Sequence, residues 1–225
     1  MLKKTAKKIV SRFFAESWRE WRIFKLYWQL KVYFAPANPN TEYYWDAKLS
    51  KFDTFWRNEN YRHILNLFPE NREFSLLDIG CALGDGCELI QGQFPKAKIT
   101  GVDISKTGIQ KCLQKNQNIS YFVLDVLKDD LPGKYDFISV IETLEHFDNP
   151  FFILDTSLPH AKKSVIVSVP YSPGYTGRIV RGEHRYAFNE KTFTAPKYNF
   201  RIVKITGFVQ STKDKCIIFE FFPPL

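Results

Sequence analysis

The segment from Leu76 to Gly86, with the sequence LLDIGCALGDG, constrains the fold of this chain more than any other part. It begins as an apolar strand and continues into a run of small residues. A turn of small residues allows the backbone to approach a ligand closely, and the first N–H groups of a following helix are free to bind it. The segment therefore predicts a strand, a turn and a helix that together hold a nucleotide-type ligand.

From Phe74 onward, short apolar runs alternate with helical stretches, which is typical of βαβ units around a parallel sheet. The predicted strands cover 75–79, 98–104, 120–124, 135–141 and 164–169, and the predicted helices cover 86–93, 106–115 and 150–160. Two further strands, 201–209 and 215–222, flank a polar turn. We expect an α/β fold, a Rossmann-like, seven-stranded, mostly parallel sheet with a C-terminal antiparallel hairpin and an N-terminal helical extension.

The extension is expected to cover residues 1–70, and the α/β domain residues 71–225. Residues 3–34 lack Gly and Pro, and their apolar side chains recur at steps of three and four, as on one face of a helix. Residues 1–34 hold nine basic and two acidic side chains, whereas the remainder holds 23 and 22. A basic amphipathic helix is predicted, followed by a linker at 35–40 and an aromatic-rich helical region at 41–68.

Three roles remain open for the basic helix: a lid across the ligand pocket, contact with a membrane surface, and binding of nucleic acid. The near-neutral remainder of the chain argues against an extended phosphate-binding track, so nucleic acid ranks last. The four cysteines form no close pair, and neither a signal-peptide pattern nor a long apolar span is present. We expect a cytoplasmic protein, with peripheral contact at the inner membrane face through residues 3–34 as an open alternative.

The spacing in the glycine-rich turn distinguishes two kinds of ligand. A dinucleotide fingerprint that starts at Gly80 requires a small residue at position 85, where this chain has Asp85. The turn instead resembles the first motif of class I S-adenosylmethionine-dependent methyltransferases, D/E-x-G-x-G-x-G, with Ala82 in place of the middle glycine. The resemblance implies S-adenosylmethionine as the cofactor. It also implies that the turn packs against the methionine part, with the acidic residue near its amino group; the matching residues are Asp78, Gly80, Cys81, Ala82 and Gly84.

Two more carboxylates end the next two predicted strands. Asp103 follows Gly84 by 19 residues and is placed to accept hydrogen bonds from both ribose hydroxyls. Asp125 ends the third strand, and in the methyltransferases this position accepts from the adenine amino group. We include the residues that follow them, Ile104 and Val126, in the predicted cofactor site. Either aspartate alone could be a helix cap, but three strand-end acids in order favour a bound cofactor.

The fourth strand leads into the sequence IETLEHF, which resembles the E-x-L-E-H element of many small-molecule methyltransferases, including the ubiquinone-pathway O-methylating branch. Methyl transfer to a hydroxyl requires alignment and a base, and an imidazole is suited to that task. The predicted catalytic residues are His146, preferred as the base, with His184, Glu142 and Glu145. A purely structural role, in which the glutamates cap the turn and His146 packs beneath the cofactor, stays open.

His184 lies in a polar segment, 171–188, that is too long for a simple connection and is predicted to cover the active site. With Glu142, Glu145 and His146 it resembles the divalent-metal site of small-RNA 3′-end 2′-O-methyltransferases, for which Mn²⁺ is a suitable ion. The chain has no evident separate RNA-binding domain. We therefore expect no resident metal and keep the metal site as an alternative.

Together these features predict an S-adenosylmethionine-dependent methyltransferase that modifies an oxygen, in preference to a nitrogen, of a small or lipid-linked acceptor. Two alternatives remain: a metal-dependent RNA 2′-O-methyltransferase, and a catalytically inactive methyltransferase-like module that docks on a membrane. The sequence does not identify the acceptor.

Overall fold

The computed structural model describes residues 37–54, 58–70, 72–207 and 215–224, together with residues 26 and 30. The basic amphipathic helix predicted for residues 3–34 therefore lies outside the described residues, apart from those two positions. Within the described residues, no helix is both long and apolar enough to cross a bilayer.

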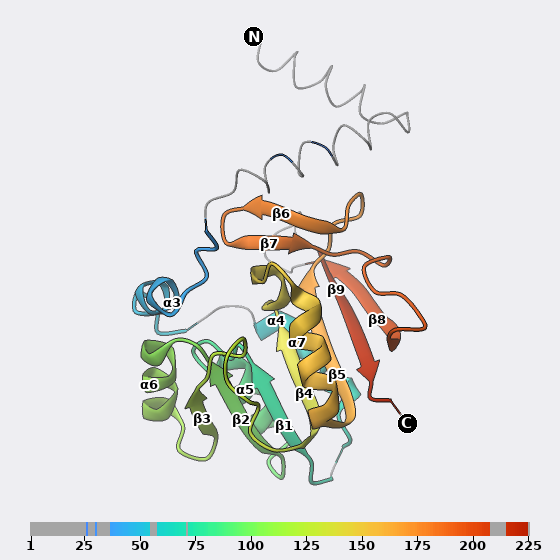
Figure 1. Ribbon diagram of the computed structural model, residues 1–225. Helices are drawn as coiled ribbons and strands as arrows, with labels where there is room; N and C mark the ends of the chain where they lie inside the picture. Colours follow the sequence, from blue (N-terminus) through green and yellow to red (C-terminus); the bar gives the residue numbers. More distant parts are fainter. Residues whose placement is uncertain are drawn as a thin grey trace.

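A seven-stranded sheet with the strand order β3-β2-β1-β4-β5-β9-β8 forms the centre of the molecule (Figure 1). The first five strands pair in parallel, whereas β9 pairs antiparallel with both β5 and β8. This arrangement confirms the predicted fold class. The strands are β1 (Ser75–Ile79), β2 (Lys98–Asp103), β3 (Ser120–Val123), β4 (Tyr135–Ile141), β5 (Ala161–Pro170), β8 (Asn199–Gly207) and β9 (Lys215–Phe222).

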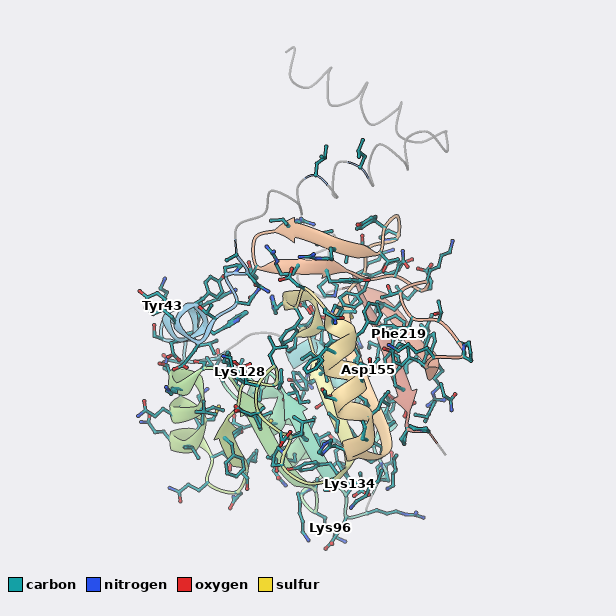
Figure 2. All side chains as sticks on the ribbon, viewed as in Figure 1. Tyr43, Lys96, Lys128, Lys134, Asp155 and Phe219 are labelled. Atoms are coloured by element: carbon teal, nitrogen blue, oxygen red, sulfur yellow. The ribbon has the colours of Figure 1, made fainter. Side chains whose placement is uncertain are left out.

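Helices cover both faces of the sheet, which is why the central strands are apolar on both sides. On one face, α5 (Asp85–Gln93) and α6 (Lys106–Lys115) pack against side chains such as Leu76. On the other face, α7 (Pro150–Ser157) packs against Leu77 and Phe219, the latter labelled in Figure 2. The predicted helix at 150–160 is α7 together with a short 3₁₀ turn, Leu158–His160.

The described part of the predicted extension packs on the α/β domain. The predicted helical region at 41–68 consists of three short pieces: α3 (Glu42–Leu49), α4 (Asn58–Arg62) and a 3₁₀ turn, Leu65–Leu67. Helix α3 contacts α6, and α4 contacts α5. Tyr61, Ile64 and Phe68 belong to the same apolar cluster as β1. Residues 58–68 thus share the core of the domain.

The polar segment 171–188 contains a hairpin that the sequence analysis missed, formed by β6 (Gly177–Arg181) and β7 (His184–Ala187). It lies beyond the carboxyl ends of β4 and β5 in Figure 1. Arg178 and Arg185 hold it there, since both donate to Oδ1 of Asp148, at 2.9 and 3.1 Å. The strands escaped prediction because their charged side chains pair with a partner distant in the sequence.

Candidate active site

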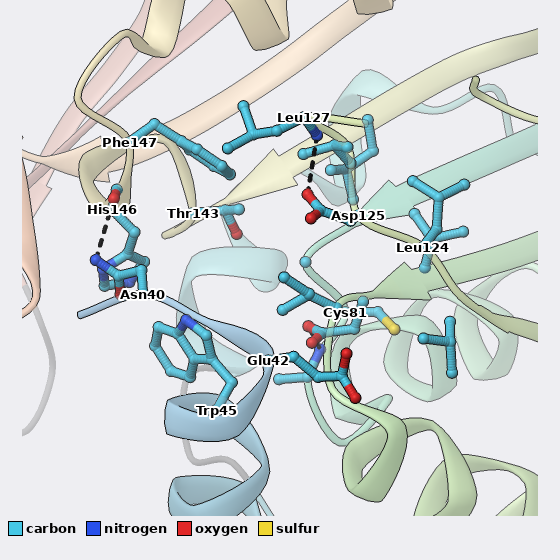
Figure 3. A pocket seen from close by; sticks show the side chains of 18 of the residues that line it. Asn40, Glu42, Trp45, Cys81, Leu124, Asp125, Leu127, Thr143, His146 and Phe147 are labelled. Carbon is cyan, nitrogen blue, oxygen red and sulfur yellow. Dashed lines mark hydrogen bonds between the residues drawn. The ribbon is translucent and has the colours of Figure 1, made fainter. Parts of the chain in front are cut away.

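A cavity of about 550 Å³ lies at the carboxyl ends of the parallel strands, between the loop after β1 and helix α3 (Figure 3). This is the edge at which parallel α/β sheets bind their ligands. Most of the predicted site residues line it: Gly80, Cys81, Ala82, Asp103, Ile104, Asp125, Val126, Glu142 and His146. Four do not: Asp78, Gly84, Glu145 and His184.

The glycine at position 80 is required by the closeness of the loop to the end of β4. Gly80 has a φ of +78°, and a Cβ atom added there would lie 2.4 Å from Oγ1 of Thr143. The N–H groups of Gly80 and Cys81 both donate to the carbonyl of Val102, which fixes the loop against β2. The loop therefore passes between two strands with no room for a side chain.

Two residues of the cavity wall have strained backbones. Ala82 and Glu142, with φ of 50° and 51°, are the non-glycine residues with positive φ in the described part of the chain. Such conformations cost about 1–3 kcal/mol each and cluster at functional sites. Both residues line the cavity, and Ala82 occupies the position of the missing middle glycine. The strain supports this cavity as the functional site.

The carboxylate of Asp103 is held in place by two backbone N–H groups. Ala82 N donates to Oδ2 at 2.9 Å, and Ser105 N donates to Oδ1 at 2.8 Å. Burial raises the pKa of Asp103 in spite of these bonds. Each oxygen keeps a further lone pair, so the group can accept from a ligand that carries two neighbouring hydroxyls.

Asp125 stands at the other side of the same wall, beyond β3 (Figure 3). Its Oδ1 accepts from the backbone N–H of Leu127 at 3.1 Å, and its Oδ2 lies 2.6 Å from the ammonium of Lys128. The structure thus places the second and third predicted acids, Asp103 and Asp125, in one cavity.

Asp78, the first predicted acid, does not line the cavity and lies behind its wall. Its carboxylate is fully buried and accepts from Tyr61 Oη at 2.8 Å and from Ser139 Oγ at 2.6 Å. Burial raises its pKa to about 6. Ser139 is its direct neighbour on β4, and Tyr61 lines the cavity. Asp78 therefore ties α4 and β4 to the loop, and its contact with the amino group of the cofactor, through water or directly, stays a prediction.

Gly84 also lies off the cavity and serves the turn. It is the N-cap of α5 with a φ of +78°, and a Cβ atom added there would lie 2.7 Å from the hydroxyl of Tyr121. The motif thus has a glycine at position 84 because α5 begins too close to the sheet there to leave room for a side chain.

His146 lies in a 3₁₀ turn after β4, Leu144–His146, and its ring lines the cavity. Its Nδ1 lies 3.3 Å from the carbonyl oxygen of Glu183 in the β6–β7 turn. Because a carbonyl can only accept, Nδ1 carries the proton in this bond, and Nε2 of the neutral ring keeps its lone pair. The ring also packs edge-on against Trp45 and His184, with centroids 4.9 and 5.3 Å away.

The two glutamates of the E-x-L-E-H element have separate surroundings. Glu142 accepts from the hydroxyl of Ser168 at 3.2 Å in the cavity wall. Glu145 is buried, and one of its oxygens lies 3.9 Å from Nε2 of His146. Glu145, His146 and His184 offer ligand atoms that all lie within 4.8 Å of one another. Two imidazoles and a carboxylate suit a transition metal or zinc, so three of the four residues of the alternative metal set come together.

Residues 38–48 form and support one wall of the cavity, which the sequence pattern did not predict. Asn38 and Asn40 both donate to the carbonyl of His146 at 3.1 Å, and Lys48 forms an ion pair with Glu183 at 2.6 Å. Trp45 lines the cavity beside His146. The available signal was the Asn-Pro-Asn-Thr stretch before an aromatic helix, in which Thr41 is the N-cap.

Comparisons with known proteins identify the family of the chain. A family model described as a methyltransferase domain matches residues 52–194. The malonyl-[acyl-carrier protein] O-methyltransferase 2 of Ilyobacter polytropus is 32% identical over 96 residues, which cover 40% of this chain and 37% of the relative. The ubiquinone biosynthesis O-methyltransferase of Dechloromonas aromatica is 33% identical over 86 residues, which cover 35% and 36%. The chain thus spans little more than a third of these curated relatives.

Solved structures share the fold. The N-methyltransferase NodS from Bradyrhizobium japonicum, in complex with S-adenosyl-L-homocysteine, aligns with a TM-score of 0.58 and 20% identity over 80% of this chain and 99% of NodS. The [4+2]-cyclase SpnF aligns with a TM-score of 0.61 and 12% identity over 74% of this chain and 81% of SpnF. The fold by itself thus supports more than one reaction.

Proposed function

Because the chain belongs to the class I S-adenosylmethionine-dependent methyltransferases, we propose that it methylates an oxygen of a small or lipid-linked acceptor. Family membership supports S-adenosylmethionine as the cofactor and methyl transfer as the reaction. The acceptor and the residues that act on it are part of the proposal. The observation that carries it is the meeting of Asp103, the strained loop and His146 in one cavity.

The residues present fit the cofactor. The two backbone bonds that orient Asp103 leave its carboxylate able to accept from the ribose hydroxyls. Asp125 and Val126 would hold the adenine, Ile104 would flank the ribose, and the loop at 80–82 would hold the methionine part. Several carboxylates in the wall suit a cationic sulfonium. Bound S-adenosylmethionine supplies an electrophilic methyl group on that sulfonium.

His146 is the proposed base. Its Nε2 takes the proton of the acceptor hydroxyl as the oxygen forms its bond to the methyl carbon, and the electron pair of the breaking carbon–sulfur bond stays on sulfur. The carbonyl of Glu183 holds the ring in the tautomer that this step requires. His184 does not line the cavity, so we assign it a positioning role against the His146 ring, in place of the second base. Glu142 shapes the wall through its strained backbone.

Calorimetry with S-adenosylhomocysteine and transfer of a labelled methyl group from S-adenosylmethionine test the proposal on the full-length protein. We expect binding of the product, weakened by Asp103→Ala, and incorporation of label into a hydroxyl acceptor such as catechol. A protein that fails to bind S-adenosylhomocysteine, or binds it equally well as Asp103→Ala, contradicts the proposal. Binding without transfer to any acceptor favours the inactive module that docks through residues 3–34.

The cluster of Glu145, His146 and His184 favours a second candidate, a metal-dependent 2′-O-methyltransferase acting on an RNA 3′ end. These three side chains would hold the ion. Titration of the chelator-treated protein with Mn²⁺ tests this candidate, with His184→Ala expected to abolish binding. RNA methylation that persists in excess chelator, or equal Mn²⁺ affinity of the variant, refutes it.

A further inference from the structure

The ring of His146 contacts two elements that are far apart in the sequence. Its Nδ1 lies 3.3 Å from the carbonyl oxygen of Glu183, in the turn between β6 and β7. The indole of Trp45, on helix α3, packs edge-on against the ring with the centroids 4.9 Å apart, and Figure 3 shows both side chains at the same end of the cavity. Helix α3 and the turn must therefore both stay in place for the ring to keep its orientation.

The side chain of Lys48 contacts both of these neighbours. Its ammonium lies 2.6 Å from Oε1 of Glu183 and 4.7 Å from the centroid of the Trp45 ring. The carboxylate and the face of the aromatic ring both attract a cation. One side chain thus connects helix α3, which carries Trp45, to the turn that carries Glu183.

The ion pair between Lys48 and Glu183 is largely shielded from water. The two side chains are 25% and 26% exposed. Burial opposes ionisation of Glu183, but hydrogen bonds from Lys48 and from its own backbone N–H, together with the charge of Lys48, lower its pKa to about 2. Because screening by water is reduced, this pair is held more firmly than ion pairs on the open surface.

The tip of the β6–β7 hairpin depends on contacts from residues 38–48. Gly182, which precedes Glu183, is exposed, and a Cβ atom added there would meet no described atom within 4 Å. On the side of the cavity wall, the carbonyl of Glu183 accepts from Nδ2 of Asn40 at 2.8 Å, and its carboxylate binds Lys48. The linker and helix α3 therefore hold both polar groups of Glu183 and set the position of its carbonyl.

We propose that Lys48 is a positioning residue for His146. By binding Glu183 and covering Trp45, it holds the Glu183 carbonyl against Nδ1, so that the neutral ring carries its proton on Nδ1 and keeps the lone pair of Nε2. Neither Lys48 nor Glu183 lines the cavity, so Lys48 acts through the ring and not on the acceptor. The inference rests on the proposed function, because that function takes His146 as the base.

Nitrogen NMR of the full-length protein tests the inference without an acceptor, since the two ring nitrogens of histidine give different signals in each tautomer. The chain has four histidines, and the spectrum of His146→Gln identifies the signals of this ring. At about pH 8, where an ordinary imidazole is neutral, the wild type should show the Nδ1–H form. Lys48→Met keeps the apolar stem and removes the charge. It should raise the ratio of the Nε2–H form to the Nδ1–H form about two- to fivefold, the size expected for one ion pair.

Methyl transfer provides a second measurement. Lys48→Met should lower kcat about two- to fivefold at unchanged affinity for S-adenosylhomocysteine, and Lys48→Arg, which keeps the charge, should restore most of the rate. Lys197→Met is the matched control. Lys197 pairs with Asp155 at 3.1 Å and lies 4.8 Å from the centroid of the Tyr198 ring, so it makes the same two kinds of contact with residues outside the cavity wall.

The two variants of the ion pair should not be additive. Lys48→Met combined with Glu183→Ala should change the tautomer ratio no more than either substitution alone, because both remove the same contact. Additive changes refute the proposal, as do an unchanged ratio in Lys48→Met, an equal change in Lys197→Met, or a wild-type ring that carries its proton on Nε2. Failure to bind S-adenosylhomocysteine contradicts the proposed function instead, and the tautomer ratio still decides the role of Lys48.

Discussion

Asp78 is expected to make the stability of this protein depend on pH. Its carboxyl is fully buried beneath the glycine-rich loop, and burial raises its pKa from 3.8 to about 6 although Ser139, Tyr61 and Cys87 all donate to it. Replacement by asparagine removes the titrating group and keeps the shape. The hydroxyls of Ser139 and Tyr61 can turn to accept from the new amide, so no buried group need be left unpaired.

The direction in which the free energy of unfolding changes with pH follows from the protons bound by the folded and unfolded states. Between pH 3.8 and 6 the folded protein keeps a proton that the unfolded chain has released. The contribution of Asp78 to the free energy of unfolding is therefore complete below the unfolded pKa and is lost as pH rises through the folded pKa. The whole difference is on the order of 3 kcal/mol, and about half of it is lost between about pH 5 and pH 8.

Urea unfolding of the wild type and of Asp78→Asn at intervals between these two pH values measures the effect. Over this range the wild type should lose about half of that difference, on the order of 1 kcal/mol, relative to the variant. Asp130→Asn, a change at an exposed carboxylate, should retain the wild-type profile. Identical pH profiles for wild type and Asp78→Asn would refute the reasoning. Strongly weakened binding of S-adenosylhomocysteine by Asp78→Asn would instead support the contact with the cofactor's amino group that the motif implied.

Three further changes test the site. Asp103→Asn should weaken S-adenosylhomocysteine about ten- to a hundredfold in calorimetry, because an amide cannot accept from two N–H groups and two hydroxyls together; unchanged affinity would exclude Asp103 from the ribose site. His146→Gln should lower the rate of methyl transfer by about 10²- to 10⁴-fold at nearly constant cofactor affinity, while His160→Gln retains activity. Equal rates for His146→Gln and the wild type would rule out His146 as the base. Gly80→Ala should lose about 1–3 kcal/mol more stability than Gly133→Ala, since both have φ near +75° but only Gly80 faces a collision; equal losses on urea unfolding would contradict the steric argument.

The sequence was sufficient for the sheet because the pattern of a buried strand is local. The apolar runs at 75–79, 135–141 and 215–222 became strands with the predicted bounds. The strand-end position of Asp103 and Asp125 was also enough to bring them to one cavity, since parallel strands end at the same edge of the sheet. The role of residues 3–34 stays a prediction.

The tertiary structure decided what depends on contacts between distant residues. Asp78 has the residue type and spacing of a cofactor ligand, yet Tyr61 and Ser139, 17 and 61 positions away, occupy its oxygens. Asn40 reaches Glu183 across 143 positions, which no local pattern encodes. The glycine-rich loop thus indicates S-adenosylmethionine from the sequence alone. The partners of Asp78 and the cavity wall formed with residues 38–48 exist only in the folded chain, where the pairing of buried polar groups is decided.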